Sequence, residues 1–316
     1  HKEYRRQRQM CIRDRCISYA SAKAANRCHH GVRSILSFVM TTHPESLSTW
    51  RAELSLNYTR SSERTVVHAK HSGPLRVLQS LYPEGDAVCH NVLVHPPGGL
   101  VGGDTLDIAL HLDAQTHALV TTPGATRFYR SEQGPAAQKV HAQLGAHARL
   151  EWLPLETIAY DRCQGLNQAV FDLSETAELM AWDITALGLP QANLPFLQGH
   201  LDQHLEIKGV WLERGRIDAL DKRLMDGPLG LAQHRCMATL VFASGTDLTR
   251  DRQEQALALA REQAELAAPD IVCGVTSPHP RVVVVRALSA LVEPAQQALR
   301  AIWGAWRSGL WQMNGT

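Results

Sequence analysis

The chain has 316 residues, a formal net charge of +1 and an apolar share of 44%, so it is long enough to bury one large core or two smaller ones. It contains no run of about 18 apolar residues, which excludes a helix that crosses a membrane. The nearly neutral charge and the lack of a basic cluster in the body of the chain exclude a nucleic-acid-binding protein.

The N-terminal 40 residues differ from the rest in charge. They carry nine Lys or Arg and two acids, a charge of +7, which leaves −6 for the remainder. They show no hydrophobic period, and they lack the apolar core and small-residue cleavage site of a secretory signal. We therefore interpret residues 1–45 as an extraneous or disordered basic leader, with Met40 as a candidate start. Residues 46–316 are expected to form a single domain.

The seven cysteines stand singly, and no CxxC pair occurs. A zinc knuckle or a disulfide scaffold is therefore not expected. Reduced, isolated cysteines are typical of the cytoplasm, which is the predicted location.

Short strand-like segments follow the leader in a steady rhythm. Residues 50–58 show it first, because alternate residues from Ala52 to Tyr58 are apolar. Turn residues interrupt the pattern about every 8–15 residues, which predicts a mainly β architecture of stacked strands, in a solenoid or a sandwich, over residues 50–245. The other predicted strands cover residues 64–70, 75–78, 88–94, 105–112, 116–122, 139–144, 148–153, 169–173, 178–187 and 200–208.

The C-terminal part, residues 246–316, changes to a helical period. Residues 247–268 carry apolar side chains on one side and charges on the other, and Thr246 or Asp247 is available to cap the start. The expected apolar stripe consists of Leu248, Leu257, Ala258, Leu259 and Leu266.

A second C-terminal helix is predicted over residues 293–311, where Pro294 falls in the first turn. Strand-like residues 281–288 precede it, so the C-terminal part is predicted to be a small α/β appendage. The apolar face of this helix would be formed by Leu299, Ile302, Trp303 and Trp306.

The most closely specified backbone lies between residues 93 and 130. Two prolines and two Gly-Gly pairs, the second of them Gly102-Gly103, precede Asp104, and these residue types restrict or widen the allowed φ angles. A phosphate-binding loop is not predicted. The glycine spacing fits neither the dinucleotide nor the P-loop pattern, and residues 105–112, which follow, have the period of a strand.

Three acids stand among apolar neighbours: Asp104 after the glycines, and Asp183 and Glu213 within strand-like segments. A buried acid costs free energy unless it is paired or hydrated. One interpretation is a set of buried ion pairs, for which Arg214 and Arg130 are available partners. The other is a water-filled passage lined by carboxylates, through which a divalent cation could move. The pattern alone favours the ion pairs.

Catalytic motifs are absent from the sequence. It has no GxSxG nucleophile elbow, no HExxH motif and no Walker lysine. The sixteen histidines are dispersed, and we expect each to be solvated or hydrogen-bonded rather than a metal ligand. The one enzymatic alternative is a β-helical hydrolase that uses Asp104 and Glu213 as paired carboxylates.

Several motifs resemble those of the urease accessory protein D family (UreD, also called UreH). They are HPPGGLVGGD (95–104), TTPGATRFYRS (121–131), EWLPLETI (151–158), AWDITALG (181–188) and WLERGRID (211–218). The similarity runs from about Trp50 to the C-terminus, and the motifs occur in the order of the family.

The resemblance implies a mostly β, stacked or helical fold with two C-terminal helices. It implies a scaffold for nickel insertion rather than an enzyme: family members bind apo-urease, hold the F-type accessory protein (UreF) and through it recruit the G-type GTPase (UreG). Nickel is thought to pass through an internal tunnel, and no cofactor is bound stably. The alternative is a docking platform with the same partners and no metal path.

Site residues also follow from the resemblance. The tunnel-lining acids of the family correspond to Asp104, Asp183 and Glu213, through GGD, AWD and LER. Thr126 falls at a small hydroxyl position near the tunnel. Gly102, Gly103, Tyr129 and Arg130 belong to the same motifs. Trp303, Trp306 and Trp311 would either form an apolar docking patch for UreF or pack against the sheet.

Overall fold

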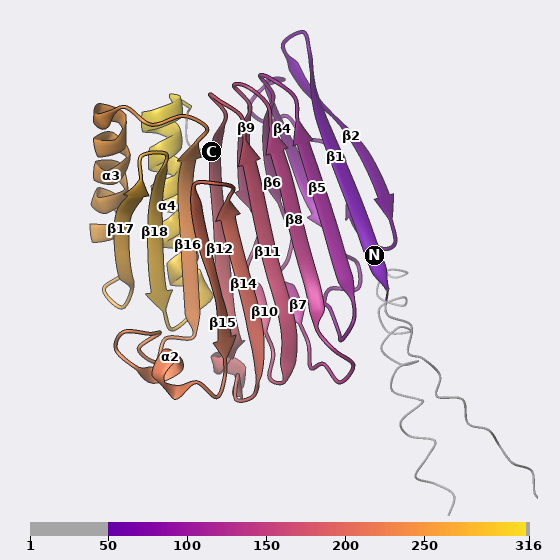
Figure 1. Ribbon diagram of the computed structural model, residues 1–316, viewed down its shortest axis with the longest axis vertical. Helices are drawn as coiled ribbons and strands as arrows, with labels where there is room; N and C mark the ends of the chain where they lie inside the picture. Colours follow the sequence, from indigo (N-terminus) through magenta and orange to yellow (C-terminus); the bar gives the residue numbers. More distant parts are fainter. Residues whose placement is uncertain (1–49, 314–316) are drawn as a thin grey trace, which may run out of the picture. The chain divides into compact units, whose positions relative to one another are not determined.

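The computed structural model describes residues 50–313, so the predicted leader lies outside the described residues. Strands dominate, and they form two sheets (Figure 1). The seven-stranded sheet has the order β15-β14-β11-β8-β5-β1-β2. Its members are β1 (Arg51–Ser61), β2 (Arg64–Ser72), β5 (Thr105–Leu112), β8 (Ala136–Leu144), β11 (Cys163–Leu173), β14 (Gly199–Ile207) and β15 (Trp211–Asp218).

The eleven-stranded sheet has the main order β17-β18-β16-β12-β9-β6-β4-β3, with β10 and β13 paired to β12 and β7 paired to β10. Its members are β3 (Arg76–Val77), β4 (Val88–Val94), β6 (His117–Thr121), β7 (Thr126–Phe128), β9 (Arg149–Leu153), β10 (Thr157–Ala159), β12 (Glu178–Leu189), β13 (Leu194–Pro195), β16 (Cys236–Ser244), β17 (Val272–His279) and β18 (Val282–Ser289).

The chain passes from one sheet to the other and back, and each pass adds a strand beside the previous one. Strands β1, β5, β8, β11 and β14 pair in parallel in one sheet. Strands β4, β6, β9 and β12 pair in parallel in the other. Antiparallel pairs close both ends of the stack. This arrangement confirms the predicted stacked β architecture and selects a solenoid over a sandwich of antiparallel hairpins.

Alternating side chains build the main core between the two sheets. In β5, for example, Leu106, Ile108, Leu110 and Leu112 are buried, whereas the residues between them are more exposed, as expected for a strand with one face in a core. This packing makes residue parity a guide to direction: a side chain an even number of residues from a core residue points between the sheets.

A second core lies on the other face of the eleven-stranded sheet, under the helices α3 (Arg250–Glu265) and α4 (Val292–Trp311). Helix α3 packs on β17 and β18, and α4 packs on β12, β16 and β18 (Figure 1). Because β12 faces both cores, nearly all of its residues are buried, which explains its almost uninterrupted apolar sequence.

The helices differ in detail from the prediction. The predicted caps Thr246 and Asp247 are wrong, because the hydroxyl of Thr249 accepts from Arg252 N at 3.3 Å and caps α3. The chain ahead of it is held by Leu248 N, which donates to Pro280 O. The predicted stripe is also wrong at Ala258, which is exposed, and at its end, where Leu266 is 74% exposed.

Helix α4 matches its predicted range within one residue, and its predicted face is buried except at the partly exposed Trp303. The short helix α2 (Lys222–Asp226) and the strands β7, β10, β13, β16 and β17 were not predicted. Among residues 50–313, no helix has the length and apolar character needed to cross a membrane.

Candidate functional site

The glycine-rich loop forms a corner that packs on the segment from Thr126 to Ser131. Leu100 is the link, since its N donates to Arg127 O at 2.7 Å and its carbonyl accepts from Tyr129 N at 2.9 Å. The glycines are required by close approach: a Cβ on Gly99 would lie 2.2 Å from Tyr129 Cε2. The two motifs are therefore one structural unit.

The predicted motif residues Gly102, Gly103 and Arg130 also lie at this corner. A Cβ on Gly102 would lie 2.5 Å from Ser131 Oγ, and Gly103 has a φ of +82°, a conformation that favours glycine. Arg130 forms an exposed ion pair with Glu132 at 2.7 Å. The partners of Asp183 and Glu213 are other residues, described below.

Asp104 is held within the same corner. Its side chain is buried, and its Oδ2 accepts a hydrogen bond from Val101 N at 3.0 Å, which closes the turn. Its carbonyl accepts from Ala137 N at 2.8 Å and joins the turn to β8. Asp104 thus has a structural role at the entry to β5.

A row of polar side chains crosses the seven-stranded sheet on its inner face. Gln138 of β8 pairs in register with Asn167 of β11, and Asn167 pairs with Gln203 of β14. Each is an even number of residues from core members of its own strand, so all three point between the sheets. Leu106, which lies two residues after Asp104, pairs in register with Gln138 of this row.

The opposite sheet carries a matching row. Thr126 of β7, Thr157 of β10 and Thr185 of β12 pair in register with one another. One pleat further along β12, Asp183 pairs with Thr239 of β16. The two rows face each other inside an otherwise apolar core, and we call them together the interlayer row.

Hydrogen bonds join the two halves of the interlayer row. Thr126 Oγ1 donates to Gln138 Oε1 at 3.1 Å, and Gln138 Nε2 donates to Asn167 Oδ1 at 3.3 Å. Asn167 Nδ2 in turn donates to Asp183 Oδ2 at 2.6 Å. Predicted site residues Thr126 and Asp183 therefore belong to one connected chain of polar contacts.

Asp183 is the partly buried carboxylate of the interlayer row. Its Oδ1 accepts from Gln203 Nε2 and from Thr185 Oγ1, each at 2.9 Å. Burial raises the pKa of Asp183 above the ordinary carboxyl value, and the nearby charge of Glu213 raises it further. The hydrogen bonds from Thr185, Asn167 and Gln203 oppose this effect without cancelling it.

Glu213 lies at the end of the row, where it meets solvent. Its Oε1 accepts from Thr239 Oγ1 at 3.1 Å, and its Oε2 accepts from Arg286 Nε at 2.7 Å. The predicted partner Arg214 is wrong: it is exposed, and the ion pair is made by Arg286 of β18. Sequence reasoning missed Arg286 because 73 residues separate it from Glu213.

A small cavity of about 10 Å³ lies between Asp183 and Glu213, which is close to the space that one water needs. Asn167, Gln203, His204 and Thr239 complete its polar lining. Asp104 does not line it, so Asp104 and Glu213 do not form the shared site that the hydrolase alternative needs. Within residues 50–313, no three His, Cys, Asp or Glu side chains are grouped so that they could hold a metal ion.

The C-terminal tryptophans pack inward. Trp306 is fully buried, and its Nε1 donates to Ala256 O at 2.8 Å. Trp311 is 5% exposed. Trp303 packs against Trp182, with ring centroids 6.3 Å apart. The prediction that these residues pack against the sheet is confirmed, and the docking-patch interpretation is wrong.

Trp303 also touches a buried ionic cluster that the sequence did not indicate. Glu151 accepts from Trp303 Nε1 at 2.6 Å, contacts His117 Nε2 at 2.8 Å and pairs with Arg307 at 3.0 Å. Arg307 reaches Glu84 at 2.7 Å. Burial acts to raise the pKa of Glu151, but His117, Arg307 and Trp303 together hold it below its ordinary value.

The fold and the interlayer row define a two-layered β-solenoid protein with a polar line through its interior. The family model described as UreD urease accessory protein matches residues 50–315. The chain therefore belongs to the UreD family of urease accessory proteins, which confirms the resemblance seen in the motifs.

Individual relatives agree with this assignment. The urease accessory protein UreD of Polaromonas naphthalenivorans (strain CJ2) is 60% identical over 264 residues, which is 84% of this chain and 96% of that protein. UreD of Paracidovorax citrulli (strain AAC00-1) is 59% identical over 266 residues, with the same two coverages. UreD of Methylibium petroleiphilum (strain ATCC BAA-1232 / LMG 22953 / PM1) is 46% identical over 286 residues, 84% of this chain and 97% of that protein.

Proposed function

We propose that this urease accessory protein is a maturation scaffold that binds apo-urease, holds UreF and through it recruits UreG, and passes nickel toward urease along the interlayer row. It would act in the reducing cytoplasm, without a resident cofactor. Asp183 and Glu213 would supply the negative charge that draws the cation inward. Thr126 and Asp104 would mark the far end, beside the glycine corner.

The observation that carries the proposal is the polar line through an apolar core, hydrogen-bonded from Thr126 to Asp183 and continued by a small cavity to Glu213. Polar groups buried in an apolar core cost free energy unless they are hydrogen-bonded. Apolar side chains of the same volume would fill this space without that cost. Amide, hydroxyl and carboxylate oxygens are weak ligands for a borderline cation compared with imidazole or thiolate. A line of weak ligands suits an ion that must leave again.

The chemistry of passage follows from the size of the cavity. A space of about 10 Å³ does not hold a hydrated nickel ion, so nickel would exchange its waters for side-chain oxygens of Asn167, Gln203 and Asp183. At the exposed end, the guanidinium of Arg286 occupies the position on Glu213 that a cation would take. Displacement of Arg286 from Glu213 would therefore open the row.

The same small cavity favours the second candidate, a docking platform without a metal path. In that function, the interlayer row would only fix the register of the two sheets, since each member is bound to another. Both candidates share the fold and the partners, so an experiment must separate nickel loading from complex assembly.

The test is urease activation in cells that co-express urease and its accessory proteins. Asp183→Asn and Glu213→Gln remove charge with little change in shape. Asp202→Asn is the matched control, since Asp202 lies on β14 next to Gln203 but points outward to pair with Arg216 at 2.7 Å. Purified urease is assayed for nickel content, and a pull-down on this chain reports the bound urease, UreF and UreG.

The nickel path predicts that both variants lower the nickel content of urease several-fold while the partners stay bound, and that the control does neither. The docking platform predicts normal nickel content for all three. If nickel content and partner binding fell together, the variants would report a folding role for the row, and the path would be unsupported. A bulky Thr126→Leu substitution adds a steric test, because only the path requires free space beside Gln138.

A further inference from the structure

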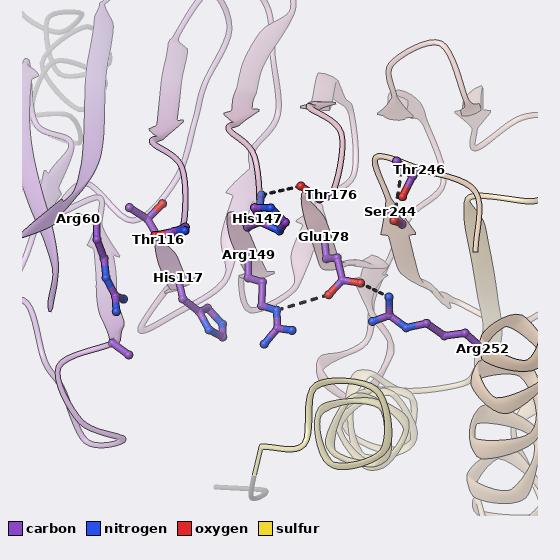
Figure 2. Close-up of a pocket in the computed structure, with 12 residues that line it drawn as sticks. Arg60, Thr116, His117, His147, Arg149, Thr176, Glu178, Ser244, Thr246 and Arg252 are labelled. Atoms are coloured by element: carbon purple, nitrogen blue, oxygen red, sulfur yellow. Dashed lines mark hydrogen bonds and ion pairs between the residues drawn. The ribbon is translucent and has the colours of Figure 1, made fainter. Parts of the chain in front are cut away.

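A second cavity, of about 430 Å³, lies where β6, β9 and β12 begin, away from the interlayer row. This volume falls in the usual range of small-molecule sites. Its walls come from the turns that enter these three strands, from the end of β16 and from α3 (Figure 2). None of the residues assigned to the nickel path lines it.

One level of the eleven-stranded sheet forms the base of this cavity. His117 of β6, Arg149 of β9, Glu178 of β12 and Ser244 of β16 pair in register, one after the other. The in-register pairing, parallel from β6 to β12 and antiparallel between β12 and β16, thus places four polar side chains in a line. Figure 2 shows His117 and Arg149 pointing to the same side, with Arg252 reaching toward Glu178 from α3.

The cavity has more positive than negative charge. Arg60, Arg149 and Arg252 line it together with one acid, Glu178. That single carboxylate forms ion pairs with two of the arginines: its Oε2 lies 3.4 Å from Arg149 Nε, and its Oε1 lies 2.5 Å from an Arg252 nitrogen. A guanidinium carries five N–H donors, so both arginines keep donors for a further anion.

Arg60 adds a third cation that is only weakly neutralised. Its nearest acid, Glu63, is 3.7 Å away and 98% exposed, so solvent screens the pair strongly. The ionic cluster beneath the cavity offsets part of this excess, because Arg307 there pairs with two acids, Glu151 and Glu84. The lining itself carries three arginines against one acid, so a net positive charge of about one remains.

Burial makes this excess costly in the empty cavity. Arg149 is about one third exposed, and burial lowers its pKa, as does the neighbouring charge of Arg252. An anion placed between the two guanidiniums would relieve both effects. Ser244 adds a hydroxyl: its Oγ accepts from Thr246 N at 3.3 Å, which leaves its proton free to donate to a ligand.

We propose that this cavity binds a small oxyanion that carries two or more negative charges, a phosphate or a polycarboxylate. Arg149 and Arg252 hold it through charge-assisted hydrogen bonds, Arg60 completes the charge balance, and Glu178 competes with it for the same two guanidiniums. The site is independent of the proposed nickel path.

The test uses titration calorimetry on the full chain, with inorganic phosphate in one arm and citrate in the other. Arg252→Gln should weaken binding about tenfold or more, a loss of about 1.4 kcal/mol for each factor of ten. Glu178→Gln should act in the opposite direction and tighten binding, because it removes the internal competitor. Arg250→Gln is the matched control on the same helix, where Arg250 is 87% exposed and pairs with Glu254.

The arm that binds more tightly identifies the source of the oxyanion. Saturable binding that is weakened by Arg252→Gln, strengthened by Glu178→Gln and unchanged in Arg250→Gln supports the proposal. No saturable binding in either arm up to about 10 mM, where affinity is too weak to matter, would overturn it, as would equal affinity in all variants. Should Arg252→Gln fail to fold, Arg60→Gln gives the same test without disturbing α3. Asp183→Asn should leave the affinity unchanged.

Discussion

Asn167 and Asp183 join the two sheets through the middle of the solenoid, with Asn167 Nδ2 donating to Asp183 Oδ2 at 2.6 Å. The partners that satisfy the carboxylate there, Asn167, Gln203 and Thr185, are neutral side chains. Its charge is hydrogen-bonded but not neutralised by them. An uncancelled negative charge inside a low-dielectric core attracts a cation more strongly than the same charge at the surface.

The first prediction concerns pH. Because the folded-state pKa of Asp183 is raised, the folded protein binds a proton more tightly than the unfolded chain. Stability from this group is therefore greater at low pH, and it is lost as pH rises from the ordinary value of 3.8 through the raised pKa. Asp183→Asn should abolish this loss, which amounts to about 1.4 kcal/mol for every tenfold difference in proton affinity between the folded and unfolded states.

Urea unfolding between about pH 2 and pH 8 measures the effect on the free energy of unfolding. Asp202→Asn gives the opposite sign, because Arg216 holds the pKa of Asp202 below its ordinary value. Stability from Asp202 is present above pH 3.8 and is lost only as pH falls through the lower folded-state pKa. An Asp183→Asn variant that follows the wild-type curve would show that the pKa of Asp183 is the same in the folded and unfolded protein.

The second prediction concerns the exposed end of the interlayer row. Arg286→Gln should lower the free energy of unfolding by at most about 1 kcal/mol, since Arg286 is 55% exposed in its pair with Glu213. Under the proposed function, it should also leave urease activation equal or faster, because Glu213 becomes free for nickel. Thermal unfolding and the rate of activation check the two parts. A loss of activation as large as that of Glu213→Gln would show that the ion pair itself is needed.

The third prediction concerns the buried ionic cluster under α4. Glu151→Gln should destabilise the protein by roughly 3 kcal/mol, because it leaves a buried arginine without one of its two carboxylates. Glu254→Gln is the control: that acid sits in an exposed pair on α3, where removal should cost less than about 0.5 kcal/mol. If chemical unfolding gave the same loss of stability for Glu151→Gln and Glu254→Gln, burial would not strengthen the ion pairs of the cluster.

Sequence patterns predicted the parts of the fold that depend on local period. Alternation identified β4 and β5 with their bounds, and helical spacing identified α4. An element that buries one face has apolar residues at the period of its secondary structure, and this period is visible in the sequence. The same rule failed for β16, which has a core on each face and therefore no alternation. The cap of α3 was misplaced because a contact to Pro280 delays the start of the helix.

The site was predicted only in part, for a related reason. Acids in apolar segments pointed to Asp183 and Glu213, and these do line one cavity. The neutral members Asn167 and Gln203 could not be identified from the sequence, because an amide side chain in a strand is normally predicted to face solvent. Arg286 could be found only from the register of β16 and β18, which no local pattern contains.

The final prediction tests whether the glycine corner is a steric requirement. Gly99→Ala would place a Cβ 2.2 Å from Tyr129 Cε2 and 3.1 Å from Arg127 O. The ring cannot move freely, because Tyr129 packs on Tyr160 with centroids 4.8 Å apart and its N is bonded to Leu100 O. We expect a loss of about 1–3 kcal/mol, the usual cost of overpacking.

Gly124→Ala is the matched control from the neighbouring turn. A Cβ there meets nothing within 4 Å, and Gly124 is not among the glycines with positive φ. It should leave stability unchanged or raise it by up to about 1 kcal/mol, because alanine restricts the unfolded chain. Since Leu100 ties the loop to the strand that bears Thr126, Gly99→Ala should also disturb the Thr126 end of the interlayer row. Amide hydrogen exchange would then speed up at Arg127 and Tyr129 in Gly99→Ala alone, whereas equal exchange in both variants would show that the loop and the row are independent.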